Sequence, residues 1–151
     1  MHYQHTQRGN LVLGICGAFC LLTLLSSLMF SSPILVLPVV APFLLFGWLF
    51  HSLTIEVDPR QIELRFGPGL IWKRFKTAEI QSARTVRNHW YQGWGIRWIW
   101  SGWLFNISGL DAVEIDLSSG RRYRLGTDQP QKLLRAIHSA CGSPLGSTRQ
   151  P

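Results

Sequence analysis

The sequence predicts an α+β membrane protein, in which two N-terminal transmembrane helices precede an antiparallel β domain that ends in one helix. Three observations carry this prediction: two uncharged apolar runs, a change to a two-residue period, and an apolar helical stripe near the C-terminus. Charge divides at the same place. Arg8 is the one charged side chain in residues 1–50, and all 8 acidic residues lie in residues 51–151. The second part is long enough for one compact core.

The two apolar runs cover residues 11–30 and 33–50. Roughly 17–25 apolar residues in a helix span a hydrocarbon core of about 30 Å. A link of only two serines and a proline, residues 31–33, requires the two helices to be antiparallel, and the same residues favour the start of the second helix. We therefore expect a transmembrane hairpin over residues 11–52. A cleaved signal peptide is the competing interpretation. The sequence has no basic cluster before the first run, and a signal peptide does not explain the second run.

Basic residues near the helix ends predict the orientation. The short link has none, whereas Arg8 precedes the first helix, and Arg60 and Arg65 follow the second. We expect a multi-pass protein of the cell membrane, with both termini and the β domain in the cytoplasm. Residues 1–10 are expected to be an N-terminal tail. Trp48 is expected to anchor the second helix at the membrane interface.

A two-residue period begins at Leu53 and predicts antiparallel strands with one buried face. Residues 53–57 and 62–66 form a first hairpin, and residues 70–76 and 80–87 predict two further strands. The clearest hairpin joins residues 113–117 to 121–125. Its predicted inward side chains are Val113, Ile115, Tyr123 and Leu125.

A helix is expected to close this domain, which we assign to residues 53–142. Asp128 is the expected cap, with Gln131 as its capping-box partner. The stripe consists of Leu133, Leu134, Ile137 and Ala140, and Gly142 ends the helix. Residues 143–151 are polar and rich in Gly, Pro and Ser, which predicts a disordered tail.

Strands that curl into a partly open barrel, with a helix at one end, satisfy this order and match the pleckstrin-homology-like (PH-like) architecture. Residues 88–97 and 108–115, followed by 121–128, make the likeness specific. Together with the preceding helices they resemble small bacterial membrane proteins with two transmembrane helices and a PH-like domain, over about residues 10–141. The resemblance implies a PH-like antiparallel β-barrel or sandwich at the bacterial inner membrane. It carries over no catalytic or ligand-binding residue.

An aromatic segment is the least typical stretch of the chain. Tryptophan favours the membrane–water interface, where the ring is apolar and the N–H stays hydrated. Rings that fill the core of a small barrel are the alternative, and we expect some in each role. The candidate membrane or partner surface comprises Trp90, Tyr91, Trp94, Arg97, Trp98, Trp100 and Trp103.

Basic side chains Arg121, Arg122 and Arg124 extend this candidate surface toward anionic lipid. The alternative is a solvated strand face on which Glu114 and Asp116 pair with the arginines across the hairpin. Single-stranded nucleic acid would suit basic and aromatic residues together, but the membrane anchor argues against it and no nucleic-acid partner is expected.

Catalytic and metal-binding patterns are missing from the sequence, so no enzyme, cofactor or metal site is expected. The three cysteines, Cys16, Cys20 and Cys141, are odd in number and scattered, which is untypical of a disulfide framework or zinc site. The segment 118–120 has the composition of a turn.

The sequence therefore favours a non-enzymatic, membrane-anchored module that binds a partner protein, anionic lipid headgroups, or both. One alternative is an accessory or assembly subunit of a larger membrane complex or homo-oligomer. Its contacts would come from the helices, whose Gly14, Gly17 and Ala18 permit close packing. A cryptic membrane enzyme or transporter component is a further alternative. The apolar runs contain no ionisable group for an ion pathway.

Overall fold

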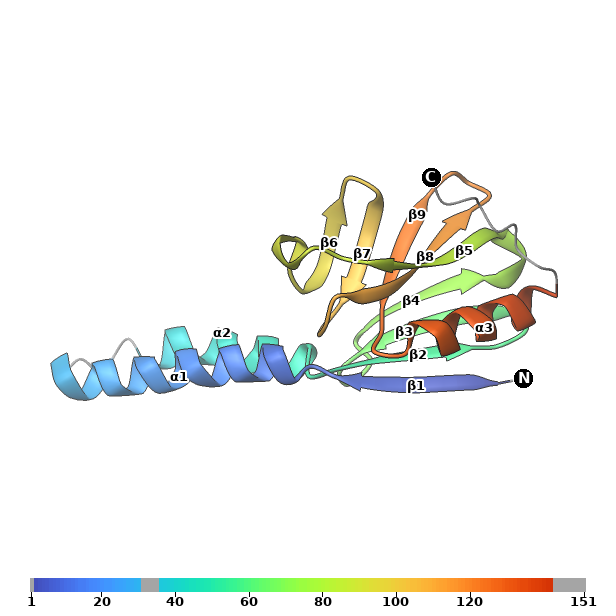
Figure 1. The fold of residues 1–151 in the computed structure, drawn as a ribbon. Coiled ribbons are helices and arrows are strands. Elements are labelled where there is room, and N and C mark those ends of the chain that lie inside the picture. The colour runs from blue at the N-terminus through green and yellow to red at the C-terminus, as the bar shows by residue number, and fades with distance from the viewer. Residues whose placement is uncertain (1, 31–35, 143–151) are drawn as a thin grey trace.

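The computed structural model describes residues 2–30 and 36–142 and has an α+β fold (Figure 1). Two helices extend from a β domain built of two sheets, and a third helix packs on that domain. The elements are β1 (Tyr3–Arg8), α1 (Asn10–Phe30), α2 (Val36–Leu49), β2 (Ser52–Val57), β3 (Gln61–Phe66), β4 (Ile71–Lys76), η2 (Thr77–Glu79), β5 (Ile80–Arg87), η3 (Trp90–Gln92), β6 (Gly95–Ile99), β7 (Gly102–Asn106), β8 (Asp111–Leu117), β9 (Arg122–Gly126) and α3 (Pro130–Cys141).

The strands form a four-stranded sheet, β1-β2-β3-β4, and a five-stranded sheet, β5-β8-β9-β7-β6. Neighbours are antiparallel except for β7 and β9, which run parallel, so the expectation of an antiparallel domain is wrong for this one pair. The predicted strands at residues 53–57, 62–66, 70–76 and 80–87 are confirmed as β2 to β5, within a residue or two at their ends.

The late hairpin is confirmed in both pairing and facing. Val113 lies opposite Leu125, and Ile115 lies opposite Tyr123. All four side chains are buried in one core. Alternation fixes the facing because a slip of one residue would turn this apolar set away from the core.

The core lies between the two sheets and is closed by α3. Leu133 and Ile137 of α3 are fully buried among side chains from both sheets. The helix ends as expected, with Gly142 in the left-handed conformation. Its start is not as expected: the N-cap is Gln129 rather than Asp128. Pro130 occupies the first turn, where its fixed φ and missing N–H suit a helix start, and none of the described side chains caps the helix.

The expected N-terminal tail contains a strand instead. β1 pairs with β2 from Tyr3 opposite Val57 to Arg8 opposite Ser52. The Gln7 side-chain amide donates to the carbonyl oxygen of Ser108 at 3.0 Å, which links β1 to the loop before β8. The strand before the apolar helices therefore belongs to the same sheet as the strand that follows them.

The helices α1 and α2 lie alongside each other (Figure 1), with the rings of Phe19 and Phe43 stacked at 4.8 Å. In the described part of the chain, one helix, over Asn10–Met29, is long and apolar enough to cross a membrane, and a signal sequence near the N-terminus meets the same criterion. α2 is apolar but covers only 14 described residues. The short link and the predicted start of the second helix lie outside the described residues, as does the predicted tail at 143–151.

Candidate functional site

The aromatic segment folds as η3, β6 and β7, on the side of the β domain from which the helices extend (Figure 1). β6 is the edge strand of the five-stranded sheet. Most rings of the aromatic segment face outward: Trp90 is 75% exposed, Tyr91 64%, Trp98 69%, Trp100 105% and Trp103 41%. So many exposed indoles on one segment form a surface that water solvates poorly.

Local contacts hold these rings in place. Trp98 and Trp103 lie opposite each other on β6 and β7, edge to face at 5.6 Å. In η3 the backbone N–H of His89 donates to the Gln92 side chain at 2.9 Å. The rings of His89 and Tyr91 stack at 5.1 Å. The exposed rings are therefore presented by a paired strand and a capped turn.

Trp94 takes the other role expected for this segment. It is half-buried and packs against the core, and its indole N–H has no hydrogen-bond partner among the described residues. The expected division between core and surface therefore separates Trp94 from its neighbours.

The basic residues do not form one free face. Arg124 donates to Glu114 at 2.6 Å, and its side chain is only 17% exposed. Arg122 donates to Asp116 at 2.5 Å, and Arg84 also pairs with Glu114. The expected cross-hairpin ion pairs are therefore present, and Arg121 is the exposed member of the predicted arginine set.

These ion pairs change the titration of their members. Burial raises the pKa of the Asp116 carboxyl, but hydrogen bonds from Ser82 and Arg122 outweigh burial and hold the pKa below its ordinary value. The same hydrogen bond raises the pKa of Arg122. On the other sheet, burial of Glu63 is likewise outweighed by Arg74 and Arg65, so its pKa is also lowered.

Sequence reasoning missed two further exposed apolar side chains near the helices. Leu70 is 66% exposed and Trp72 55%. They follow a turn at Gly67, which lies against α2: a Cβ on Gly67 would stand 2.4 Å from the carbonyl oxygen of Leu49. Trp48, the predicted anchor, is 52% exposed at the same end of α2. The Gly-Pro-Gly turn before Leu70 was the available signal, but only the fold brings it to the helices.

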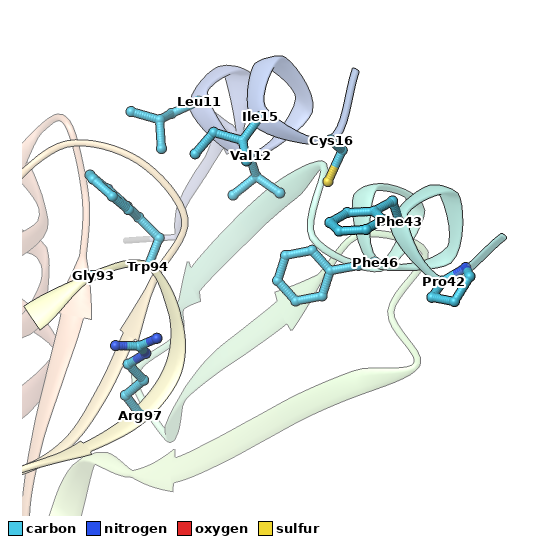
Figure 2. A pocket seen from close by; sticks show the side chains of 10 residues that line it. All are labelled: Leu11, Val12, Ile15, Cys16, Pro42, Phe43, Phe46, Gly93, Trp94 and Arg97. Carbon is cyan, nitrogen blue, oxygen red and sulfur yellow. The ribbon is translucent and has the colours of Figure 1, made fainter. Parts of the chain in front are cut away.

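A cavity of about 590 Å³ opens where the aromatic segment meets the helices (Figure 2). Its walls come from the first turns of α1, the last turns of α2, and the chain from Gly93 to Arg97. The lining is apolar except for Arg97.

One cluster of metal-ligand type lies within residues 2–30 and 36–142: His2, Glu56 and Asp58, with ligand atoms within 4.8 Å of one another. Both ring nitrogens of His2 already face carboxylates, Nε2 toward Glu56 at 3.0 Å and Nδ1 toward Asp58. Serines 118 and 119 lie in the β8–β9 turn, as expected.

Comparison with known proteins finds no relative of this chain: no family model, no curated protein and no solved structure matches it.

Proposed function

We propose that the chain is a non-enzymatic, membrane-anchored module with a PH-like β domain. In this proposal α1 and α2 cross the inner membrane as a hairpin, and the domain binds anionic lipid headgroups, a membrane-associated partner, or both at the cytoplasmic face. The observation that carries it is the exposed aromatic segment on the side of the domain from which the helices extend.

The pairing of β1 with β2 supports the hairpin. β1 comes before α1 and β2 comes after α2, and the two form one antiparallel ladder. If α1 crosses the membrane, the chain must return across it for that ladder to form. Cleavage of α1 as a signal peptide would remove β1 from the sheet and leave the edge of β2 unpaired. The described span of α1, at about 1.5 Å per residue, matches a hydrocarbon core of about 30 Å.

Two sheets closed by the C-terminal α3 support a PH-like domain. The basic contribution to membrane binding is smaller than the sequence suggests, because Arg122 and Arg124 are neutralised by Asp116 and Glu114. Tryptophans, whose attraction to the membrane interface is not screened by salt, become the main contact. Trp48, Trp90 and Trp98 are the side chains that we expect to contact headgroups.

Full-length protein in lipid nanodiscs tests this proposal. A spin label on Trp90→Cys or Trp98→Cys, in a variant without the native cysteines, should be protected from a water-soluble relaxation agent and accessible to a lipid-soluble one. Ser139→Cys on α3 is the matched control, because Figure 1 places α3 away from the membrane helices, and its label should behave as fully aqueous.

Discs of anionic and of neutral lipid separate the electrostatic attraction of the arginines from the interfacial attraction of the tryptophans. Added salt should weaken protection only in the anionic discs, over a screening length of about 8 Å at physiological ionic strength. Labels at Trp90 and Trp98 that are as aqueous as the label at Ser139 would refute direct membrane contact. A partner protein would then be the better account of the exposed rings. The full chain is required, since a fragment from residue 51 lacks β1.

The alternative of an accessory subunit that assembles through its helices has one observation in its favour. Gly14 and Gly17 face open space: a Cβ at either position would meet no atom of the described residues within 4 Å. The contact between α1 and α2 uses Gly47 instead, whose Cβ position lies 3.7 Å from Cys16. Gly17→Leu should therefore leave the monomer folded and abolish any dimer seen by crosslinking in membranes; an unchanged crosslink would dismiss this alternative.

A further inference from the structure

The cavity between the helices and the aromatic segment has the composition of a lipid site. Leu11 and Ile15 come from α1, and Pro42 and Phe46 from α2. Trp94 and Arg97 of the β domain face them across the opening (Figure 2). A volume of about 590 Å³ lies within the range of about 300–1,000 Å³ that small-molecule sites occupy. One apolar wall and one charged group suit an amphiphile rather than a polar metabolite.

Arg97 is available to an anion. It is exposed, and it forms no ion pair with any carboxylate in residues 2–30 and 36–142. By contrast, glutamate or aspartate pairs with each of Arg65, Arg74, Arg84, Arg122 and Arg124. A guanidinium binds phosphate oxygens in a bidentate manner, which makes Arg97 suited to a phosphate headgroup.

Gly93 leaves room for this guanidinium beside the backbone. Gly93 has a φ of +69°, which favours glycine, and a Cβ there would stand only 3.0 Å from Nη1 of Arg97. The absence of a side chain therefore lets Arg97 lie against the turn beside Trp94. Residues far apart in sequence therefore form the apolar walls of the cavity and supply the Arg97 guanidinium.

The cavity also lies at the correct depth. α1 begins at Asn10, and Leu11 to Cys16 rise by about 8 Å along it. If α1 spans the bilayer, these turns occupy the boundary between headgroups and acyl chains. A lipid seated here would place its phosphate at Arg97 and its chain along Ile15 and Phe46.

We propose that this cavity binds one membrane phospholipid with an anionic headgroup, its phosphate held by Arg97 and one acyl chain lying between α1 and α2. The inference rests on the proposed membrane insertion and deepens it, because it assigns lipid recognition to one stoichiometric site rather than to the exposed surface. Such a lipid would join the β domain to the helices and fix their relative orientation.

Native mass spectrometry of the full chain in nonionic detergent tests the site with added phosphatidylglycerol. We expect one tightly retained lipid per chain, and weaker retention of phosphatidylcholine with the same acyl chains. Arg97→Gln should weaken phosphatidylglycerol retention about tenfold. The matched control is Arg135→Gln, which removes the same charge from an exposed position on α3 outside the cavity and should leave retention unchanged.

A second pair of variants tests the acyl-chain half. Ile15→Trp should fill the cavity and weaken both lipids, whereas Leu21→Trp, on an exposed part of α1 outside the cavity, should weaken neither. Glycerol phosphate, which supplies the headgroup without a chain, should not compete.

Equal effects of Arg97→Gln and Arg135→Gln, or of Ile15→Trp and Leu21→Trp, would overturn the inference. Flotation of the same samples with vesicles separates this failure from that of the proposed function. Chains that float and lack the specific lipid refute only the cavity site. Chains that do not integrate into vesicles refute membrane insertion and the site that rests on it.

Discussion

At the residue scale, Glu114 behaves unlike the solvated strand residue that the sequence suggests. Its side chain is fully buried and is paired with Arg84, Arg122 and Arg124. A buried carboxylate with several arginine partners is compatible with folding because its hydrogen bonds replace those of water. Removing it would leave the guanidinium of Arg124 largely buried without its anion.

We therefore predict that Glu114→Ala lowers the free energy of unfolding by about 1–3 kcal/mol, the cost of leaving a charged partner unsatisfied. Glu79→Ala is the control, because Glu79 is exposed and lies 3.6 Å from Lys76, and the change should cost under about 0.5 kcal/mol. Urea unfolding of the full chain in nonionic detergent, followed by tryptophan fluorescence, measures both. Equal losses of unfolding free energy for the two variants would mean that the ion pairs of Glu114 stabilise the fold no more than the exposed pair of Glu79 does.

The facing of β8 gives a companion prediction. Ile115 is fully buried, so Ile115→Ala should cost about 2–5 kcal/mol through lost apolar contact and a cavity. Glu114, its neighbour on the strand, is unsuitable as an insensitive control because it is buried as well. The same urea unfolding, with Glu79→Ala as the control, measures the loss. A loss below about 1 kcal/mol for Ile115→Ala would place this side chain outside the core.

The lowered pKa values of Asp116 and Glu63 predict acid sensitivity. A carboxyl whose pKa is lower in the folded state adds stability above its unfolded pKa, about 3.9 for Asp and 4.3 for Glu, and loses it as pH falls through the folded pKa. The free energy of unfolding should therefore fall as the pH decreases below about 4. Asp116→Asn should remove part of this decrease, and Asp111→Asn, at an exposed position, should not. If the free energy of unfolding falls identically at low pH in the wild type and both variants, Asp116 is not a source of the acid sensitivity.

At the scale of elements, the parallel pair β7–β9 depends on a glycine. Gly102 has a φ of +128°, and a Cβ there would stand 2.0 Å from the carbonyl oxygen of Arg122 at the start of β9. Only a residue without a side chain lets the two strands approach this closely. The hairpin that carries Trp98 and Trp103 is joined to the sheet through this contact.

Gly102→Ala should therefore destabilise the domain by at least about 3 kcal/mol, since backbone strain and overpacking act together. Gly120→Ala is the control. It also has a positive φ, +77°, but faces open space, so it should cost only about 1 kcal/mol. Thermal unfolding of both variants measures the difference. A Gly102→Ala protein as stable as Gly120→Ala would mean that β7 and β9 separate without loss.

At the scale of the whole molecule, β1 and β2 join the helices to the domain. The Gly9 N–H donates to the His51 carbonyl oxygen at 2.7 Å, so the chain enters α1 and leaves α2 side by side. A reporter placed after Gly9 would separate β1 from α1, and topology is better read from single cysteines.

In a background without native cysteines, Ser32→Cys should react with a membrane-impermeant maleimide in intact cells. Ser139→Cys should react only after the membrane is opened, because α3 belongs to the cytoplasmic domain in our proposal. The physical reason is that the link between the helices has no charge, whereas arginines lie near their other ends, and basic residues favour the cytoplasmic side. Labelling of Ser139→Cys in intact cells would reverse the orientation and place the exposed tryptophans at the opposite leaflet.

The sequence by itself determined the features that short-range patterns encode. Alternation in 113–117 and 121–125 predicted both the pairing and the buried face of β8 and β9, because one apolar face leaves one acceptable register. The uncharged residues 11–30 predicted α1, and Gly142 predicted the end of α3. The resemblance to PH-like membrane proteins stays a prediction.

Only the tertiary structure decided the features that depend on distant contacts. β1 is an edge strand of polar residues, so no apolar period reports it, and β2 supplies its partner. Glu114 is buried because arginines from β5 and β9 converge on it. The cavity likewise needs α1, α2 and Arg97 together. Periodicity describes one segment at a time, whereas burial and cavities are set by the segments that pack against it.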